Sequence, residues 1–326
     1  MDDPAGKICI AIDVGGTNLR FTLVDERGRA LLRERQPTEI HQGKERFLQR
    51  LFLSIASLRS WADSSGRKVV AIGAGVPGLI SNDGTVYSSV NLLPIEGLNL
   101  RETLSAATGL PATVINDANA AAWGEKCYGA GRSMASLLML TLGTGVGSGL
   151  ILDNRLWTGS DGAAGEFGHA TVEPDGKPCP CGNHGCLEQY ASASAIVAAA
   201  REAIREGKRG ALAGIPAAAL NAELLADVAR GGDAAARSIF EDAGRYLGIA
   251  AATAVNLLNL DGIILGGGVA ASYDLIAGAM HREMLARAFA IPARRVRLVR
   301  AELGDDAGIL GAAAMAMANV AATSAD

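Results

Sequence analysis

Two segments of this 326-residue chain repeat the same order of parts, and this repeat limits the folds that the chain can adopt. Residues 12–25 contain an apolar strand, a Gly-Gly-Thr turn, a second apolar strand and a closing aspartate. Residues 140–153 contain the same parts in the same order around Gly-Thr-Gly. A repeat of this kind indicates a duplicated domain that carries two strand–turn–strand hairpins.

Strand and helix patterns alternate around each hairpin, which indicates α/β domains with sheet cores. A hydrophobic content of 49% and a charged content of 20% are enough to bury a sizeable core. The repeat places the domain boundary near residue 117. The predicted strands cover 69–75, 112–115 and 262–265, and the predicted helices cover 100–108, 118–124, 191–206, 222–229, 233–258 and 307–320.

Charge and hydropathy exclude several classes of partner. The net charge is −4 without a long basic run, so we expect no nucleic acid and no anionic membrane as a partner. The apolar stretch 8–12 is short and runs into Asp13, which is typical of a buried strand rather than a signal peptide. Later apolar stretches fall short of a span of ~20 residues. We therefore expect a cytoplasmic protein whose five cysteines are reduced.

Both hairpin turns have features of phosphate-binding loops. Glycine lets backbone N–H groups approach an anion without interference from a Cβ atom, and a threonine adds a hydroxyl donor. An ordinary hairpin turn is the more common explanation for one such loop, but two of them favour phosphate binding. The candidates are Asp13, which could hold a water on Mg²⁺, with Gly15, Gly16 and Thr17 in the first turn and Thr144 and Gly145 in the second.

A third glycine-rich segment, Gly266, Gly267 and Gly268, follows a predicted strand. Bare backbone at this point could let an adenosine pack against it. A tight strand-to-helix turn is the more frequent explanation of such a segment alone.

Asn116 and Asp117 lie at the end of the predicted strand 112–115 and before a helix. Both residue types are preferred helix caps, so capping explains them as well as function does. A carboxylate at the carboxyl end of a sheet strand is also well placed to act as a general base in a ligand crevice.

Three cysteines, Cys179, Cys181 and Cys186, lie within eight residues among glycine and proline. Thiolates with one imidazole suit a closed tetrahedral Zn²⁺ site. The spacing allows either His169 or His184 as the fourth ligand. A disulfide with one odd thiol is the alternative, and a reducing compartment disfavours it.

Glu166 and Glu188 flank this cysteine segment, and carboxylates accept bonds from paired hydroxyl groups of a sugar. Solvated surface glutamates are the ordinary alternative. Asn91 is a weaker candidate of the same kind, for which a turn asparagine is an equal explanation.

Five motifs in this order resemble those of the ROK family (repressors, open reading frames and kinases). With the glycines they span residues 13–268, nearly the whole chain, and the cysteine motif is highly specific. The motifs are Asp13-x-Gly15-Gly16-Thr17-x-x-Arg20, Asn116-Asp117-Ala118-Asn119, Leu142-Gly143-Thr144-Gly145-Val146-Gly147, Glu166-x-x-Gly168-His169 and Cys179-x-Cys181-Gly182-x-x-Gly185-Cys186-x-Glu188.

The resemblance implies an α/β fold of two actin/hexokinase-like (ribonuclease H-like) domains with an interdomain cleft. The first domain would comprise 1–117 and about 305–326, and the second 118–304. The resemblance also implies a homodimer or a homotetramer.

The resemblance further implies ATP-dependent phosphorylation of a hexose hydroxyl, with ATP, Mg²⁺ and a structural Zn²⁺. Asp117 would be the general base. Asn116, Asp117, Glu166, His169 and Glu188 would contact the sugar, and His169, Cys179, Cys181 and Cys186 would bind zinc.

Glucose is the first expected substrate, because segments 116–125 and 76–92 look like those of bacterial glucokinases. N-acetylmannosamine, N-acetylglucosamine and fructose kinases share the motifs. Sugar-responsive repressors of the family carry a helix-turn-helix segment before the first motif, for which the residues before Asp13 leave no room. We therefore expect an enzyme rather than a repressor or an inactive sugar-binding protein.

Overall fold

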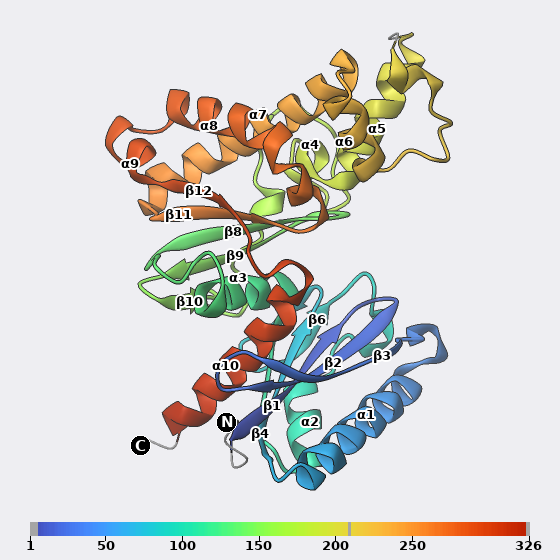
Figure 1. Cartoon of the computed structure of the whole chain (residues 1–326), viewed down its shortest axis with the longest axis vertical. Helices are drawn as coiled ribbons and strands as arrows, with labels where there is room; N and C mark the ends of the chain where they lie inside the picture. The colour runs from blue at the N-terminus through green and yellow to red at the C-terminus, as the bar shows by residue number, and fades with distance from the viewer. Residues whose placement is uncertain (1–5, 208–209, 324–326) are drawn as a thin grey trace. The chain divides into compact units, whose positions relative to one another are not determined.

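The computed structural model describes residues 6–207 and 210–323, which form two compact units (Figure 1). Unit 1 consists of the described residues in 1–132, 156–164 and 305–326. Unit 2 consists of the described residues in 133–155 and 165–304. Residues 118–132 therefore pack with unit 1. The domain boundary near residue 117 rests on the sequence repeat and stays a prediction.

The two five-stranded sheets have the same strand order, which agrees with the repeat in the sequence. The first has the order β3-β2-β1-β4-β7 and the second β10-β9-β8-β11-β12. In each sheet the first two strands of the repeat pair antiparallel, and the next two strands add in parallel. The strands are β1 (Lys7–Val14), β2 (Asn18–Asp25), β3 (Ala30–Pro37), β4 (Lys68–Val76), β7 (Ala112–Asn116), β8 (Leu137–Leu142), β9 (Val146–Leu152), β10 (Arg155–Trp157), β11 (Gly262–Gly266) and β12 (Arg297–Arg300).

Helices of unit 1 pack on a sheet whose two sides differ in side-chain size. One side carries large apolar residues such as Ile10 and Phe21, which join Phe47 and Leu51 of α1 in one buried cluster. The unit contains α1 (Lys44–Ser64), α2 (Leu100–Thr108), α3 (Asp117–Tyr128), α10 (Ala307–Thr323), the short helices η1 (Ile40–Gln42), η2 (Leu93–Ile95) and part of η6 (Gly304–Asp306), and the hairpin β5 (Leu79–Ile80) and β6 (Val86–Ser88).

The other side of this sheet carries small residues, so α10 and α3 approach it closely. A Cβ atom at Gly73 of β4 would lie 2.1 Å from the carbonyl oxygen of Ala312. A Cβ atom at Gly311 of α10 would lie 1.7 Å from the carbonyl oxygen of Ala120. Only glycine permits these distances, and close packing of this kind holds α3, which begins at Asp117, in place.

Unit 2 is built around α7, which crosses α8 at glycines. Cβ atoms at Gly244 and Gly248 would lie 2.5 Å and 2.6 Å from backbone oxygens of α8. The unit contains α4 (Glu188–Ala191), α5 (Ala193–Arg205), α6 (Ala222–Arg230), α7 (Ala234–Leu258), α8 (Tyr273–Arg287), α9 (Ala290–Arg295), and the short helices η3 (Phe167–His169), η4 (Ala211–Gly214) and η5 (Gly268–Ser272).

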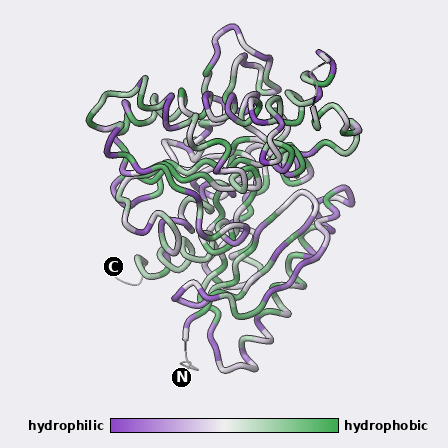
Figure 2. The backbone as a smooth tube through the Cα atoms, turned by 45° about the horizontal axis from the view of Figure 1, so that its top comes forward, coloured by the Kyte–Doolittle hydropathy of each residue, from purple (hydrophilic) through white to green (hydrophobic). Residues whose placement is uncertain are grey.

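The apolar residues concentrate along the strands of the sheets, and hydrophilic residues alternate along the outer helices and loops (Figure 2). Among the described residues, no helix is long and apolar enough to cross a membrane.

Most of the predicted elements are present, with one correction. The predicted helix 191–206 is α5, which begins at Ala193 and not at Ala191. Ala191 ends α4, Ser192 is extended (φ −76°, ψ 163°), and the Ser192 side chain accepts the N–H of Ala195 as an N-cap. Helix α1 is not predicted from the sequence, although Phe47, Leu51, Ile55 and Leu58 have the helical spacing of a buried face.

Candidate active site

The first glycine turn connects β1 and β2, and its two glycines leave no room for a Cβ atom. The N–H of Gly15 donates to the carbonyl oxygen of Asn18 at 2.9 Å, and a Cβ atom at Gly15 would lie 2.8 Å from that oxygen. A Cβ atom at Gly16 would lie 3.0 Å from Cβ of Asn91. The structure therefore brings the exposed Asn91 against the first turn, together with the exposed Thr17.

Asp13 has an ion-pair partner that the sequence analysis does not identify. In the β1–β2 ladder Asp13 lies opposite Arg20, and Nε of Arg20 donates to Oδ2 of Asp13 at 2.6 Å. The same oxygen also pairs with Nη2 of Arg20. The signal for this pair is the hairpin itself, because a turn at 15–17 makes residues 13 and 20 cross-strand neighbours.

The second glycine turn connects β8 and β9 and contacts Glu188. The N–H of Gly143 donates to the carbonyl oxygen of Gly145 at 2.9 Å. Oε2 of Glu188 accepts the N–H of Val146 at 2.9 Å, and a Cβ atom at Gly145 would lie 2.3 Å from this Oε2. Glycine at position 145 therefore makes space for the Glu188 carboxylate.

Gly266, Gly267 and Gly268 form the transition from β11 to η5. Gly267 has φ +79°, and a Cβ atom there would lie 2.6–2.8 Å from backbone atoms of Leu142. This explains Gly267 as a packing requirement at the end of β8. A Cβ atom at Gly268, in contrast, would meet nothing within 4 Å.

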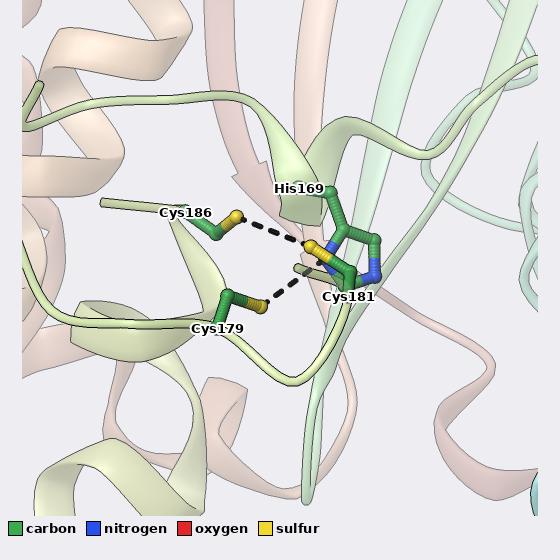
Figure 3. A group of neighbouring side chains, drawn as sticks. All are labelled: His169, Cys179, Cys181 and Cys186. Atoms are coloured by element: carbon green, nitrogen blue, oxygen red, sulfur yellow. Dashed lines mark hydrogen bonds between the residues drawn. The ribbon is translucent and has the colours of Figure 1, made fainter. Parts of the chain in front are cut away.

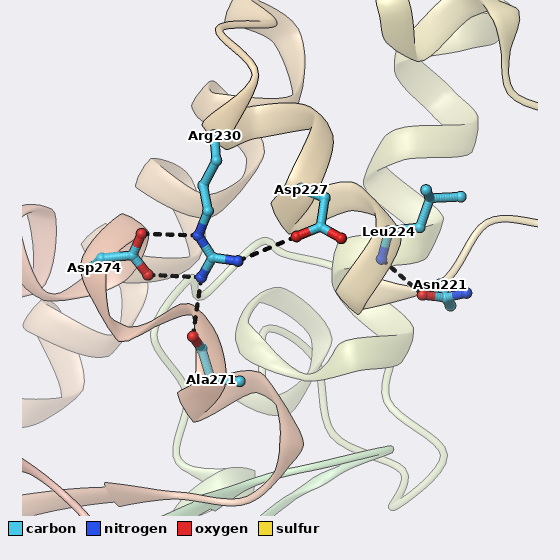
Figure 4. A network of polar contacts seen from close by, with 6 residues as sticks. All are labelled: Asn221, Leu224, Asp227, Arg230, Ala271 and Asp274. Carbon is cyan, nitrogen blue, oxygen red and sulfur yellow. Dashed lines mark hydrogen bonds and ion pairs between the residues drawn. The ribbon is translucent and has the colours of Figure 1, made fainter.

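Arg230 of α6 holds the segment that follows these glycines (Figure 4). Its Nη2 donates to the carbonyl oxygen of Ala271 at 3.0 Å and to Oδ1 of Asp274 at 2.8 Å, while Nε donates to Oδ2 of Asp274 at 3.0 Å. This paired contact lowers the pKa of the Asp274 carboxyl. The nearby Asn221 caps the other end of α6 by accepting the N–H of Leu224.

Asn116 and Asp117 lie where β7 ends and α3 begins. Oδ1 of Asn116 accepts the N–H groups of Ala118 and Asn119 at 2.9 and 3.0 Å, so Asn116 is the N-cap of α3. Its Nδ2 donates to the carbonyl oxygen of Gly78 at 3.0 Å. The Asp117 side chain is exposed, and its Oδ1 accepts the N–H of Ala118 at 2.8 Å.

In unit 2, η3 positions Glu166 and His169 against β9. The hydroxyl of Ser148 accepts the N–H of Phe167 at 3.0 Å, and a Cβ atom at Gly168 would lie 2.0 Å from the carbonyl oxygen of Val146. Burial raises the pKa of the Glu166 carboxyl, the charge of His169 opposes this shift, and the charge of Glu188 adds to it. Glu166, His169 and Glu188 thus interact electrostatically at one place.

Three cysteines and one histidine form a group with the chemistry of a metal site (Figure 3). The ligand atoms of His169, Cys179, Cys181 and Cys186 all lie within 4.8 Å of one another. Nδ1 of His169 lies 3.7 Å from Sγ of Cys179, and Sγ of Cys181 lies 3.7 Å from Sγ of Cys186. The structure brings His169, not His184, to the cysteines.

These distances fit a tetrahedral ion. Sulfur and nitrogen ligands at about 2.3 and 2.0–2.1 Å from Zn²⁺ lie roughly 3.5–3.8 Å from one another at tetrahedral angles. The separations of 3.7 Å agree with such an arrangement. Because Nδ1 of His169 faces the thiols, Nε2 of the same ring is directed away from the ligand atoms.

The predicted site residues fall into two groups. Asp13, Gly15, Gly16, Thr17, Asn91, Asn116 and Asp117 belong to unit 1, and Thr144, Gly145, Glu166, His169, Glu188, the three cysteines and Gly266–Gly268 belong to unit 2. Within unit 1, Asn91 meets the first turn. Within unit 2, Glu188 joins the second turn to Glu166 and His169.

Comparisons with known proteins agree on one family. The model of the ROK family matches residues 9–319. The chain is 36% identical to a glucokinase of Thermotoga maritima over 94% of this chain and 96% of that protein. A ROK family glucokinase from Streptomyces griseus, solved in complex with glucose and AMPPNP, is 32% identical with a TM-score of 0.75 over 95% of this chain and 99% of that chain. A ROK family transcriptional regulator, a homolog of the E. coli MLC protein, is 28% identical with a TM-score of 0.87 over 95% and 78%.

Proposed function

The chain belongs to the ROK family, with the actin/hexokinase-like fold of its sugar kinases, and we propose that it transfers the terminal phosphoryl group of ATP to a hydroxyl of a hexose, with glucose as the first substrate. The observation that carries the proposal is the near full-length similarity to glucokinases, one of them solved with glucose and a nucleotide. Kinases for N-acetylmannosamine, N-acetylglucosamine or fructose are the alternatives within the family.

Asp117 is the proposed general base. It is exposed at the carboxyl end of β7, where α/β sheets bind ligands, and its Oδ1 accepts the N–H of Ala118 in the first turn of α3. The base accepts the proton of the attacking sugar hydroxyl as the new O–P bond forms and the bond to the leaving ADP oxygen breaks. Asn116 supports this role by capping α3, and its second amide hydrogen is the proposed contact to the sugar.

Glu166, His169 and Glu188 are the proposed sugar contacts of unit 2, and Asn91 is the further contact of unit 1. The carboxylates are acceptors for sugar hydroxyls, and Nε2 of His169 is oriented away from the cysteines. The hydrogen bond from the N–H of Val146 to Oε2 of Glu188 supports the assignment. Through this bond, the turn that would bind phosphate also orients Glu188, a proposed sugar contact.

The two glycine turns are the proposed phosphate contacts. Glycines leave the backbone of each turn without Cβ atoms, Thr17 and Thr144 add hydroxyl donors, and Gly268 offers an open surface for the adenosine. Asp13 would hold a Mg²⁺ ion through water with the carboxylate oxygen that Arg20 does not occupy. Bound there, the ion would neutralise charge on the phosphates.

The group of His169, Cys179, Cys181 and Cys186 is the proposed site of a structural Zn²⁺ ion. Its donor atoms and their separations fit that ion. A bound ion would cross-link η3 to the segment that leads into Glu188.

We also propose a homodimer or homotetramer. Unit 2 exposes Leu257, Phe289 and Ile291 by 78%, 78% and 85%, on the neighbouring helices α7 and α9 and the segment before α9. Light scattering tests this: Phe289→Glu would shift the mass toward the monomer, and Arg201→Glu on the exposed side of α5 would not.

A sugar-responsive regulator is the second candidate, because the MLC homolog has the TM-score of 0.87. Both candidates bind sugar, so turnover discriminates between them. We would incubate the purified chain with ATP, Mg²⁺ and a panel of hexoses and measure ADP release. Sugar-dependent release, fastest with glucose, supports the kinase; sugar binding without release from any hexose would overturn it.

A further inference from the structure

A cavity in the described part of unit 1 lies apart from Asp13 and Asp117. It has a volume of about 850 Å³ and lies beside β7. Its walls come from β7, from α2 through Arg101 and Ser105, from α3 through Asn119, from α10 through Met315, and from the loops 80–83 and 156–162. Neither Asp13 nor Asp117 lines it. This volume is within the usual range of small-molecule sites.

One wall is the free edge of a sheet. β7 is the last strand in the order β3-β2-β1-β4-β7 and pairs with β4 in parallel, with Ile72 opposite Ala112. The N–H of Ile72 donates to the carbonyl oxygen of Pro111, so the backbone groups of Ala112 and Val114 point away from β4. The cavity therefore presents backbone donors and acceptors in alternation along β7.

Asn119 supplies a buried acceptor that lacks a partner. Its side chain is 3% exposed, and its Oδ1 has no hydrogen-bond partner among the described residues. A buried, unpaired amide oxygen costs free energy, so natural proteins retain one mostly where a ligand or water supplies the donor. Among the buried side-chain polar atoms without a partner in the described chain, Oδ1 of Asn119 is the one that belongs to a residue of the cavity wall.

Several other polar side chains of the wall have partners within the protein. Asn99 caps α2 through Glu102 and donates to Asp83, and Asn319 donates to Thr113 at 2.9 Å. Asn82 binds the loop that carries Thr158. The wall is thus rich in amides, and Oδ1 of Asn119 is its one buried side-chain acceptor without a partner among the described residues.

The charge of the wall indicates a neutral ligand. Its charged side chains are Asp83, Arg101 and Glu102. The Asp83 carboxylate already accepts bonds from Ser81 and from the N–H of Thr85 at 3.0 Å. A phosphate would meet a single guanidinium group against two carboxylates, whereas hydroxyl groups can pair with the amides, with Asn119 and with the β7 edge.

We propose that this cavity binds a neutral monosaccharide, in addition to the sugar that the chain phosphorylates. Helices α2, α3 and α10 and two loops surround the β7 edge, which favours a small ligand over an added peptide strand. Asn116 lines the cavity and caps α3, so the ligand would contact the residue next to the proposed base.

Equilibrium dialysis with radiolabelled D-glucose, D-mannose or N-acetyl-D-glucosamine, without nucleotide, tests the proposal. The wild-type chain should bind two equivalents of at least one sugar. Glu188→Ala removes a proposed contact of the substrate site and should leave one equivalent. Adding Ser105→Trp, which fills the cavity, should abolish the remaining equivalent, whereas Ala106→Trp on the exposed side of the same helix should not.

Asn119→Ala is the second variant. It removes one hydrogen-bond acceptor, so it should lower the affinity of the cavity for the sugar about tenfold. Circular dichroism and residual turnover check the fold of each variant. A wild-type chain that turns over glucose but binds one equivalent of each sugar would overturn this proposal and leave the kinase intact. Two equivalents without turnover would overturn the kinase and leave the cavity site.

Discussion

The two units share one strand order but hold their proposed site residues on different supports. In unit 1, Asp13, Asn116 and Asp117 lie at the ends of regular strands or at the start of a helix. In unit 2, Glu166 and His169 lie at the start and end of η3 and Glu188 begins α4, and the segment of turns between the two helices contains the three cysteines.

This difference shows two ways to fix a side chain. A strand end is held by the sheet and by close helix packing, as at Gly73 and Gly311. An irregular segment has no ladder, so it needs cross-links: Ser148 to Phe167, Glu188 to Val146, and the Cys/His group. Loss of the Asp117 carboxylate in unit 1 should therefore change chemistry without changing stability, while loss of a metal ligand in unit 2 should change sugar affinity and stability together.

The largest effect is expected from Asp117→Asn. The variant keeps the size of the side chain but removes the base, so kcat should fall by about 10²–10⁴-fold. The melting temperature and sugar binding should stay near wild type, because the side chain is exposed. Steady-state ADP release and a thermal melt measure the two effects. Asp63→Asn, on the exposed side of α1, is the control; near-normal turnover of Asp117→Asn would contradict the base assignment.

Cys181→Ala, in contrast to Asp117→Asn, should change stability and sugar affinity together. The residue is exposed, so little packing is lost, and the effect comes through the metal. We expect loss of bound zinc, a destabilisation of about 2–4 kcal/mol and a raised KM for the sugar, because η3 and Glu188 lose their cross-link.

Metal content by mass spectrometry, a thermal melt and sugar titration measure these three quantities. Cys127→Ala, a partly buried cysteine outside the group, is the matched control. If Cys181→Ala retained metal and melted at the wild-type temperature, the metal site would be refuted.

Gly311→Ala probes the packing that supports α3. The new Cβ atom would lie 1.7 Å from a backbone oxygen of Ala120, which cannot yield without moving a helix. We expect a loss of about 1–3 kcal/mol in the free energy of unfolding, measured in urea. Gly308→Ala on the same helix, whose Cβ atom would meet its nearest neighbour at 3.8 Å, should be neutral or slightly stabilising. Equal stability of the two variants would disprove the close contact.

Gly145→Ala should have the smallest effect. Its Cβ atom would lie 2.3 Å from Oε2 of Glu188, which is the end of a flexible side chain and can move. Stability should change little, while the KM for sugar should rise about tenfold through the misplaced carboxylate. Gly143→Ala, whose Cβ atom meets nothing within 4 Å, should leave the KM for sugar unchanged. An unchanged KM for sugar in Gly145→Ala would argue against Glu188 as a contact.

Regular elements and ligand types were predictable from local pattern. Helix α2 covers the predicted residues 100–108, and β7 and α7 differ from prediction by one residue at one end. Ser192 was missed because one residue in an extended conformation does not disturb the helical spacing around it. The spacing alone left His169 and His184 open as the fourth ligand; the family resemblance favoured His169, and the structure brings His169 to the cysteines.

The amino-acid sequence alone determined the repeat, the α/β class, the two glycine turns and a metal-type donor set, because these depend on the order of nearby residues. Only the tertiary structure determined that Glu188 binds the second turn and that Asn119 leaves an acceptor open beside β7. Such contacts depend on which strands become neighbours and how closely helices approach them, and residues far apart in the chain decide both.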